Sequence, residues 1–177
     1  MWSVAGRQVI ENVSMAHPSA RNDITPAGDL VEADLRSVIG YQLAQAMIAA
    51  GRMYDIAVGQ KTGLHRVEYS ILMLVRANPG CTAASLAKAL DVSTPNIALW
   101  LERVTSKGWV ERTPSTADRR SNHLRLTAGG KQTAQQATQA ILVTERASLT
   151  GLSVGELAIL AELLHKVAST RSQINLA

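Results

Sequence analysis

The segment over residues 117–130, ADRRSNHLRLTAGG, concentrates side chains that can bind anions. Asp118, Arg119 and Arg120 stand together in a polar stretch, and an alternating strand pattern follows them directly. Guanidinium groups bind phosphate through several hydrogen bonds, and a neighbouring carboxylate can orient them. The segment is therefore either an ordinary solvated charge cluster or a surface that meets a polyanion.

Positive charge is concentrated in one part of the chain. Residues 82–131 hold eight Lys and Arg against four Asp and Glu, so they carry the whole net charge of +4. Such a focus of cations is typical of a nucleic-acid partner, and random clustering of solvated charge is the alternative. Arg103 and Arg112 lie in this region and are further candidates for contacting DNA.

Composition and spacing argue against several classes of protein. Hydrophobic residues make up 46% of the 177 residues, so the chain is not disordered, and the absence of Phe requires an aliphatic core. No apolar run approaches the roughly 18–20 residues that span a bilayer, and the N-terminus lacks a secretory signal, so we expect a cytoplasmic protein without membrane contact. The spacing of catalytic, metal-ligating and phosphate-loop residues matches no known constellation. We expect no enzyme, no metal and no cofactor.

The elements that position the charged segment form a helix-turn-helix. Thr82 is predicted to cap a helix over residues 83–90, and Ser93 or Thr94 to cap a second helix. Pro95 suits the first turn of the second helix, and Gly108 suits its end. Two strands follow, over residues 109–112 and 123–126, with the charged segment in the hairpin between them.

Longer helices flank this motif. Asp29 is predicted to begin the first, with Glu32 completing a capping box, and the helix is predicted to run towards Gly59. Further helices are predicted over residues 64–78, after Thr127 and after Ser153.

The expected fold is mainly α with a small β-hairpin wing. Its expected divisions are a flexible leader (1–28, in which Met15 is a possible start), a dimerisation helix (29–62), a winged helix-turn-helix DNA-binding lobe (63–128) and dimerisation helices (129–177). The apolar faces of the flanking helices are most easily buried across a two-fold axis, which predicts a homodimer.

These residues resemble the MarR family of bacterial winged-helix transcription regulators, over roughly residues 35–167. DRRSNHLRLTAGG is similar to the family's Asp-x-Arg wing signature, and SLAKALDVSTPNIALWLERVTSKGWVER is similar to its paired helices. The resemblance implies a dimer that binds a palindromic operator in double-stranded DNA, with the second helix of the motif in the major groove. It also implies that Arg120 enters the minor groove, that Asp118 orients the wing, and that Arg112 and Arg119 meet phosphate.

The start of the second helix holds the candidates for base recognition. Ser93, Thr94 and Asn96 lie there, and Asn can pair bidentately with adenine. The alternative is that Ser93 and Thr94 only cap the helix and that Asn96 is solvated. Ala98 and Leu99 depart from the family, because many relatives have polar or basic residues there. Apolar contact with thymine methyl groups can take the place of the hydrogen bonds that those polar residues would make. Alternatively, the wing and the shape of the DNA can determine which operator is bound.

The resemblance further implies regulation by a small molecule, most simply a repressor released by a ligand. Related regulators hold aromatic acids and phenols between the two lobes, which makes Tyr41, His65, Arg66 and Tyr69 candidate ligand contacts, although packing at the helix junction also explains them. Cys81 is a candidate redox switch by the same resemblance, but no cation adjoins it in sequence and burial in the core is favoured. A winged-helix protein-interaction module without DNA binding is the alternative function.

Overall fold

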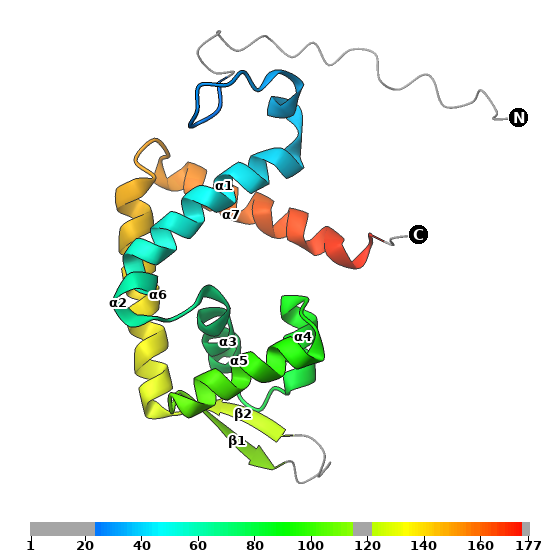
Figure 1. The fold of residues 1–177 in the computed structure, drawn as a ribbon, viewed down its shortest axis with the longest axis vertical. Helices are drawn as coiled ribbons and strands as arrows, with labels where there is room; N and C mark the ends of the chain where they lie inside the picture. Colours follow the sequence, from blue (N-terminus) through cyan, green and yellow to red (C-terminus); the bar gives the residue numbers. More distant parts are fainter. Residues whose placement is uncertain (1–23, 115–121, 175–177) are drawn as a thin grey trace, which may run out of the picture. The chain divides into compact units, whose positions relative to one another are not determined.

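The computed structural model describes residues 24–114 and 122–174, which form helices and one two-stranded sheet (Figure 1). The chain divides into two compact units, residues 1–49 and residues 50–177. Within the described residues, none of the helices has the length and apolar character needed to cross a bilayer. The mainly helical fold with a hairpin wing is as predicted.

The described part of the first unit begins with a turn and not with the predicted helix cap. Asp29 has a φ of +51° and follows Gly28, whose φ is +90°, in a turn that an isolated bridge between Ile24 and Val31 closes. Asp29 therefore does not cap a helix, and this prediction was wrong. Aspartate favours caps and left-handed turn positions alike, and the neighbouring glycine favours the turn. A 3₁₀ helix, η1 (Ala33–Ser37), follows.

The first long helix, α1 (Ile39–Tyr54), starts ten residues later than Asp29. It continues as a π-helical segment, η2 (Asp55–Gly59), and as the short α2 (Gln60–Thr62). Gly63 ends the run with a φ of +64°, a conformation that glycine adopts without strain. Large apolar side chains of η1 and α1 remain exposed, namely Leu35, Ile39, Met47 and Ile48.

In the second unit, α3 (Arg66–Ala77) is the central helix (Figure 1). It packs against the helices α5 (Thr94–Ser106) and α6 (Ala128–Ser148) and against the strand β2 (Asn122–Leu126). Its apolar stripe repeats at helical spacing and faces the core. The fully buried aliphatic side chains around it come from the residues just before α3, from α3 and α5, and from the two strands: Leu64, Ile71, Leu72, Val75, Ile97, Leu101, Val104, Val110 and Leu124.

The predicted helix-turn-helix is present as α4 (Ala83–Leu90) and α5 (Thr94–Ser106). The Oγ1 of Thr82 accepts a hydrogen bond from the amide of Ser85 at 3.2 Å, and Ser93 caps α5 in the same way. Asp91 takes a left-handed conformation, with a φ of +54°, in the turn between the helices. Gly108 follows α5 with a φ of +69° and lets the chain turn into the hairpin.

The wing consists of β1 (Val110–Pro114) and β2 (Asn122–Leu126), paired antiparallel with Val110 opposite Leu126. Cys81 pairs with Leu124 on the other edge of β2, where its carbonyl accepts the Leu124 amide at 3.0 Å. The remainder of the charged hairpin segment, including Asp118, Arg119 and Arg120, lies outside the described residues.

Two helices end the described chain. Helix α6 (Ala128–Ser148) is capped by Thr127, and α7 (Val154–Ser169) begins with the predicted capping box of Ser153 and Glu156. A short 3₁₀ turn, η3 (Thr170–Ser172), follows. No residue of α7 is buried, and its large apolar side chains are exposed: Val154, Ile159, Leu160, Leu163, Leu164 and Val167. Within the described residues of the second unit, no element covers this face.

Candidate nucleic-acid interface

Helix α5 presents its first turn to solvent. The side chains of Ser93, Thr94 and Asn96 are all exposed there, so the structure brings these predicted residues together. Ser93 also has a structural role, because its Oγ accepts a hydrogen bond from the Asn96 amide at 3.4 Å. A ligand that approaches this turn meets hydroxyl and amide groups that can donate and accept hydrogen bonds.

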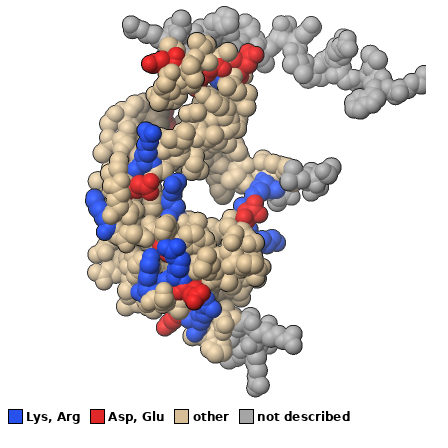
Figure 2. All heavy atoms as spheres, in the orientation of Figure 1, with Lys and Arg blue, Asp and Glu red and all other residues tan. Residues whose placement is uncertain are grey.

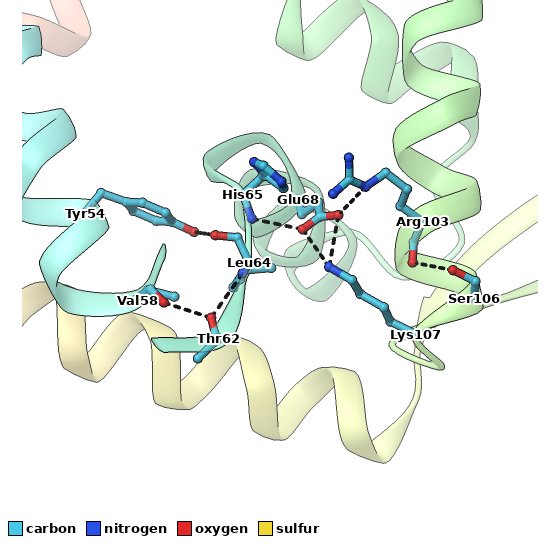
Figure 3. Close-up of polar contacts among 9 residues, drawn as sticks. All are labelled: Tyr54, Val58, Thr62, Leu64, His65, Glu68, Arg103, Ser106 and Lys107. Atoms are coloured by element: carbon cyan, nitrogen blue, oxygen red, sulfur yellow. Dashed lines mark hydrogen bonds and ion pairs between the residues drawn. The ribbon is translucent and has the colours of Figure 1, made fainter. Parts of the chain in front are cut away.

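The C-terminal end of α5 is joined to α3 by a buried carboxylate (Figure 3). Glu68 is completely buried, and its oxygens accept hydrogen bonds from Nε of Arg103 at 3.0 Å and from Nζ of Lys107 at 3.1 and 3.2 Å. The amide of His65 donates a further hydrogen bond at 2.9 Å. A buried charge is tolerated when it is paired and hydrogen-bonded in this way.

Opposing influences act on the pKa of Glu68. Burial would raise the pKa, but the hydrogen bonds from His65 and Lys107 and the charges of Lys107 and Arg103 outweigh burial and lower it below its ordinary value. Arg103 was predicted from sequence to contact DNA, and the structure shows that its Nε already donates a hydrogen bond to this carboxylate. Glu68 was not a sequence candidate, although its position three residues before Ile71 places it on the buried face of α3.

Each of the two cations also lies over an indole ring. Cζ of Arg103 is 4.9 Å from the ring centroid of Trp100, and Nζ of Lys107 is 4.6 Å from that of Trp109. Cations above an aromatic face are attracted by the ring quadrupole. The two tryptophans therefore help to fix the cations, and both pack at the edge of the core.

The described part of the wing contributes Arg112. Arg112 pairs with Leu124 across the hairpin, so its side chain leaves the sheet on the face that packs towards the helices. It is exposed and borders a hollow of about 750 Å³ between α5 and β1, together with Pro95, Ala98, Leu99 and Glu102. Figure 2 shows Lys and Arg side chains gathered over the area that α5 and the hairpin occupy, with acidic side chains among them.

Two of the four residues predicted to contact a ligand lie beside a hollow in the second unit. His65 and Arg66 border a hollow of about 290 Å³ that Tyr54, Asp55 and Leu64 also line. The hydroxyl of Tyr54 donates to the Leu64 carbonyl at 3.0 Å, and burial, with the charge of Glu68, raises the pKa of Tyr54 to about 12. Tyr54 was missed by sequence reasoning, because its position near the end of a long helix does not reveal what it meets.

The two other predicted tyrosines have partners of their own. The Tyr69 hydroxyl lies 3.0 Å from Oγ1 of Thr138, which joins α3 to α6. Tyr41 belongs to the first unit, where its hydroxyl donates to Glu32 at 3.1 Å. Only His65 and Arg66 of the four predicted contacts line the hollow.

The thiol of Cys81 is half-buried next to β2. Burial raises the pKa of the Cys81 thiol, which disfavours the reactive thiolate. Among the described residues, no group of three or more His, Cys, Asp or Glu side chains is placed to hold a metal ion.

Comparisons with known proteins agree with this geometry. The sequence model of the MarR family matches residues 64–121. The multiple antibiotic resistance protein MarR of Escherichia coli is 34% identical over 101 residues, which cover 56% of this chain and 70% of that protein. The chain belongs to the MarR family. It is thus a DNA-binding transcription regulator of the winged-helix type and not an enzyme.

Other MarR-family proteins extend the similarity along the chain. A putative transcriptional regulatory protein for the hcr operon of Thauera aromatica is 28% identical over 139 residues, or 78% of this chain and 84% of that protein. The transcriptional repressor CouR, solved bound to a 23-mer DNA duplex, matches with a TM-score of 0.72 and 28% identity, over 80% of this chain and 99% of CouR. The MarR-type fold therefore accounts for most of the described chain.

Proposed function

We propose that this regulator acts in the cytoplasm as a homodimeric repressor, which binds a palindromic operator and is released by a small ligand. The observation that carries the proposal is the exposed first turn of α5, displayed beside a basic hairpin in a fold shared with a repressor solved on DNA. In such a dimer the two α5 helices enter successive major grooves, roughly 34 Å apart.

The proposed DNA contacts fall into two groups. Thr94 and Asn96 are exposed at the start of α5 and are suited to base edges, while Ser93 is suited to the backbone because its Oγ already caps the helix. Arg112 is suited to a phosphate. Arg103 can reach a phosphate only with the guanidinium nitrogens that Glu68 leaves free.

The hairpin tip is assigned from sequence alone, because it lies outside the described residues. Arg120 is proposed to enter the minor groove, with Asp118 orienting the wing and Arg119 on a phosphate. Narrow minor grooves have a concentrated negative potential that attracts arginine, so this contact responds to groove width more than to base identity.

Dimerisation is supported by the apolar faces that the single chain leaves uncovered. Ile159 and Val154 on α7 are 61% and 86% exposed, and Ile39 on α1 is 63% exposed. Exposed apolar helix faces of this kind mark protein–protein interfaces. We propose residues 29–62 and 129–177 as the dimerisation segments and residues 63–128 as the DNA-binding lobe.

Ligand release is proposed to involve the hollow beside His65 and Arg66. An imidazole and a guanidinium at its rim suit the carboxylate of an aromatic acid, and Tyr54 and Leu64 offer apolar surface for the ring. Binding there would act on the loop that begins α3, and a change in the separation of the α5 helices would prevent both from docking at once.

The test is a titration of duplexes selected from a random library, at two salt concentrations. A regulator that neutralises about six to ten phosphates should lose roughly 10³- to 10⁵-fold in affinity between 50 and 200 mM salt. Arg120→Ala should weaken binding strongly while the dimer, measured by sedimentation, stays intact. An absence of both affinity and salt dependence in the wild-type protein would instead assign the fold to a protein-interaction module.

A further inference from the structure

Helix α5 has an apolar patch on the face that points away from the core. The buried residues Ile97, Leu101 and Val104 define the inner face, and Leu99 lies on the opposite side of the helix. The side chain of Leu99 is 56% exposed. Together with Ala98 and Pro95 it lines the hollow of about 750 Å³ next to β1. Helix α5 is the one proposed to enter the major groove. In its middle, Ala98 and Leu99 therefore present apolar side chains that can neither donate nor accept a hydrogen bond.

The surroundings of the patch indicate which part of a DNA duplex it suits. Glu102 lies one turn further along the same face, is exposed, and has no ion-pair partner among the described residues. A carboxylate there repels the phosphate backbone, so the patch is suited to the edges of bases. Arg112, across the hollow, is the cation on this rim and is placed to hold a flanking phosphate.

We infer that Leu99, supported by Ala98, contacts the 5-methyl group of a thymine and makes that base pair a determinant of operator choice. This inference rests on the proposed function, because it requires α5 to occupy the major groove. Thymine is the one base whose major-groove edge carries a methyl group. A leucine has neither donor nor acceptor, so it contributes by removing its own surface and that of the methyl group from water.

The same contact disfavours the other base pairs. A cytosine or adenine amine placed against Leu99 would lose water without gaining a hydrogen-bond acceptor. The leucine therefore selects by the match of apolar surfaces, and the hydroxyl and amide groups at the start of α5 select by hydrogen bonding at other positions. These two kinds of base recognition are separable by experiment.

The test removes the methyl group from the DNA and the leucine from the protein, alone and together. Full-length wild-type protein first selects a consensus duplex from a random library, and each thymine of one half-site is then replaced singly by deoxyuridine. Wild type should lose about fourfold in affinity at one of these positions, as expected for deletion of one buried methyl-sized group. Leu99→Ala should bind the thymine and uracil duplexes equally, and Leu99→Met, which keeps an apolar contact, should retain the preference for thymine.

The possible results separate the role of Leu99 from the proposed function as a DNA-binding repressor. Equal affinities of wild type for every uracil duplex, or a methyl effect that persists unchanged in Leu99→Ala, would overturn the role of Leu99 while leaving DNA binding in place. Failure of the wild type to select any duplex would overturn the proposed function itself. The thermal unfolding of both variants should match that of the wild type, since Leu99 is outside the core, and a large loss of stability would contradict its placement on the outer face.

Discussion

The carboxylate of Glu68 on α3 lies 3.0 Å from Nε of Arg103 on α5, which joins the centre of the core to the helix that we propose to face DNA. The two residues are 35 positions apart in the chain. Lys107 completes the arrangement from the C-terminal cap of α5. The orientation of α5 thus depends on a charge that is hidden from solvent, and not only on apolar packing.

Replacing this carboxylate should destabilise the lobe. Glu68→Gln keeps the shape of the side chain but removes the charge that two cations share, so we expect a loss of about 1–3 kcal/mol in the free energy of unfolding. Denaturant titration at fixed protein concentration measures the change. Glu111→Gln is the matched control, because Glu111 is exposed on β1, and it should alter stability by less than about 0.5 kcal/mol. Equal losses in the two variants would contradict the anchoring role of Glu68.

The same carboxylate predicts a pH dependence of stability. Because the folded-state pKa of Glu68 is below the ordinary value of 4.5, its contribution is complete above that value and is lost as the pH falls through the folded-state pKa. The difference in unfolding free energy between wild type and Glu68→Gln should therefore be constant near neutral pH and should shrink in acid below 4.5. Unfolding curves of both proteins over this range test it, and a difference that grows on acidification would show that the pKa is raised.

Two adjacent glycines at the start of α6 should respond oppositely to alanine. A Cβ on Gly130 would overlap the backbone carbonyl of Trp109, so Gly130→Ala must push α6 away from the hairpin and should cost about 1–3 kcal/mol or more. A Cβ on Gly129 would lie 3.8 Å from Oγ1 of Thr127, which is an ordinary van der Waals distance. Gly129→Ala should accordingly be neutral or stabilise by up to about 1 kcal/mol. Thermal melting of the pair provides the comparison.

Arg112→Ala should weaken binding to all duplexes alike. If Arg112 holds one phosphate, its removal should lower the slope of log affinity against log salt by about one unit in each half-site, with no change in the selected sequence. Fluorescence titration at several salt concentrations gives the slope. Arg52→Ala, which removes an exposed cation from α1, is the control and should leave the slope unchanged.

Asn96→Ala should have the complementary effect. Loss of a side chain that pairs with a base relaxes the preference at one base pair in each half-site, while the salt dependence stays the same. Selection from a random library by the variant and the wild type measures this preference. Identical base profiles would assign Asn96 to the solvent.

Sequence predicted the elements whose ends are fixed by local hydrogen bonds. Thr82, Ser93, Thr127 and Ser153 each accept a hydrogen bond from the amide three residues further along, so the residue type at the cap itself predicts where the helix begins. Asp29 shows the limit of this reasoning, because the same residue type also suits a turn with positive φ. The family resemblance was confirmed by the comparisons.

The site was less predictable than the fold. The exposed polar residues of α5 follow from helical spacing, but the Glu68 cluster depends on contacts between residues more than 30 positions apart, which a linear pattern does not encode. For the same reason the sequence, which predicted Arg103 as a DNA contact, did not reveal that its Nε donates to a buried acid. The neighbours of Tyr54 likewise come from a separate loop.

The indole rings beside Arg103 and Lys107 have a practical consequence. Two of the three tryptophans of the chain have ring centroids within 5 Å of these cations: Trp100 in the middle of α5, and Trp109 at the junction of α5 and the wing. Indole emission is sensitive to nearby charge and to water, so the protein has a built-in optical reporter at this junction. The proposed docking on an operator should accordingly change the wavelength and intensity of the ultraviolet fluorescence, so that it can be followed on unlabelled protein in real time.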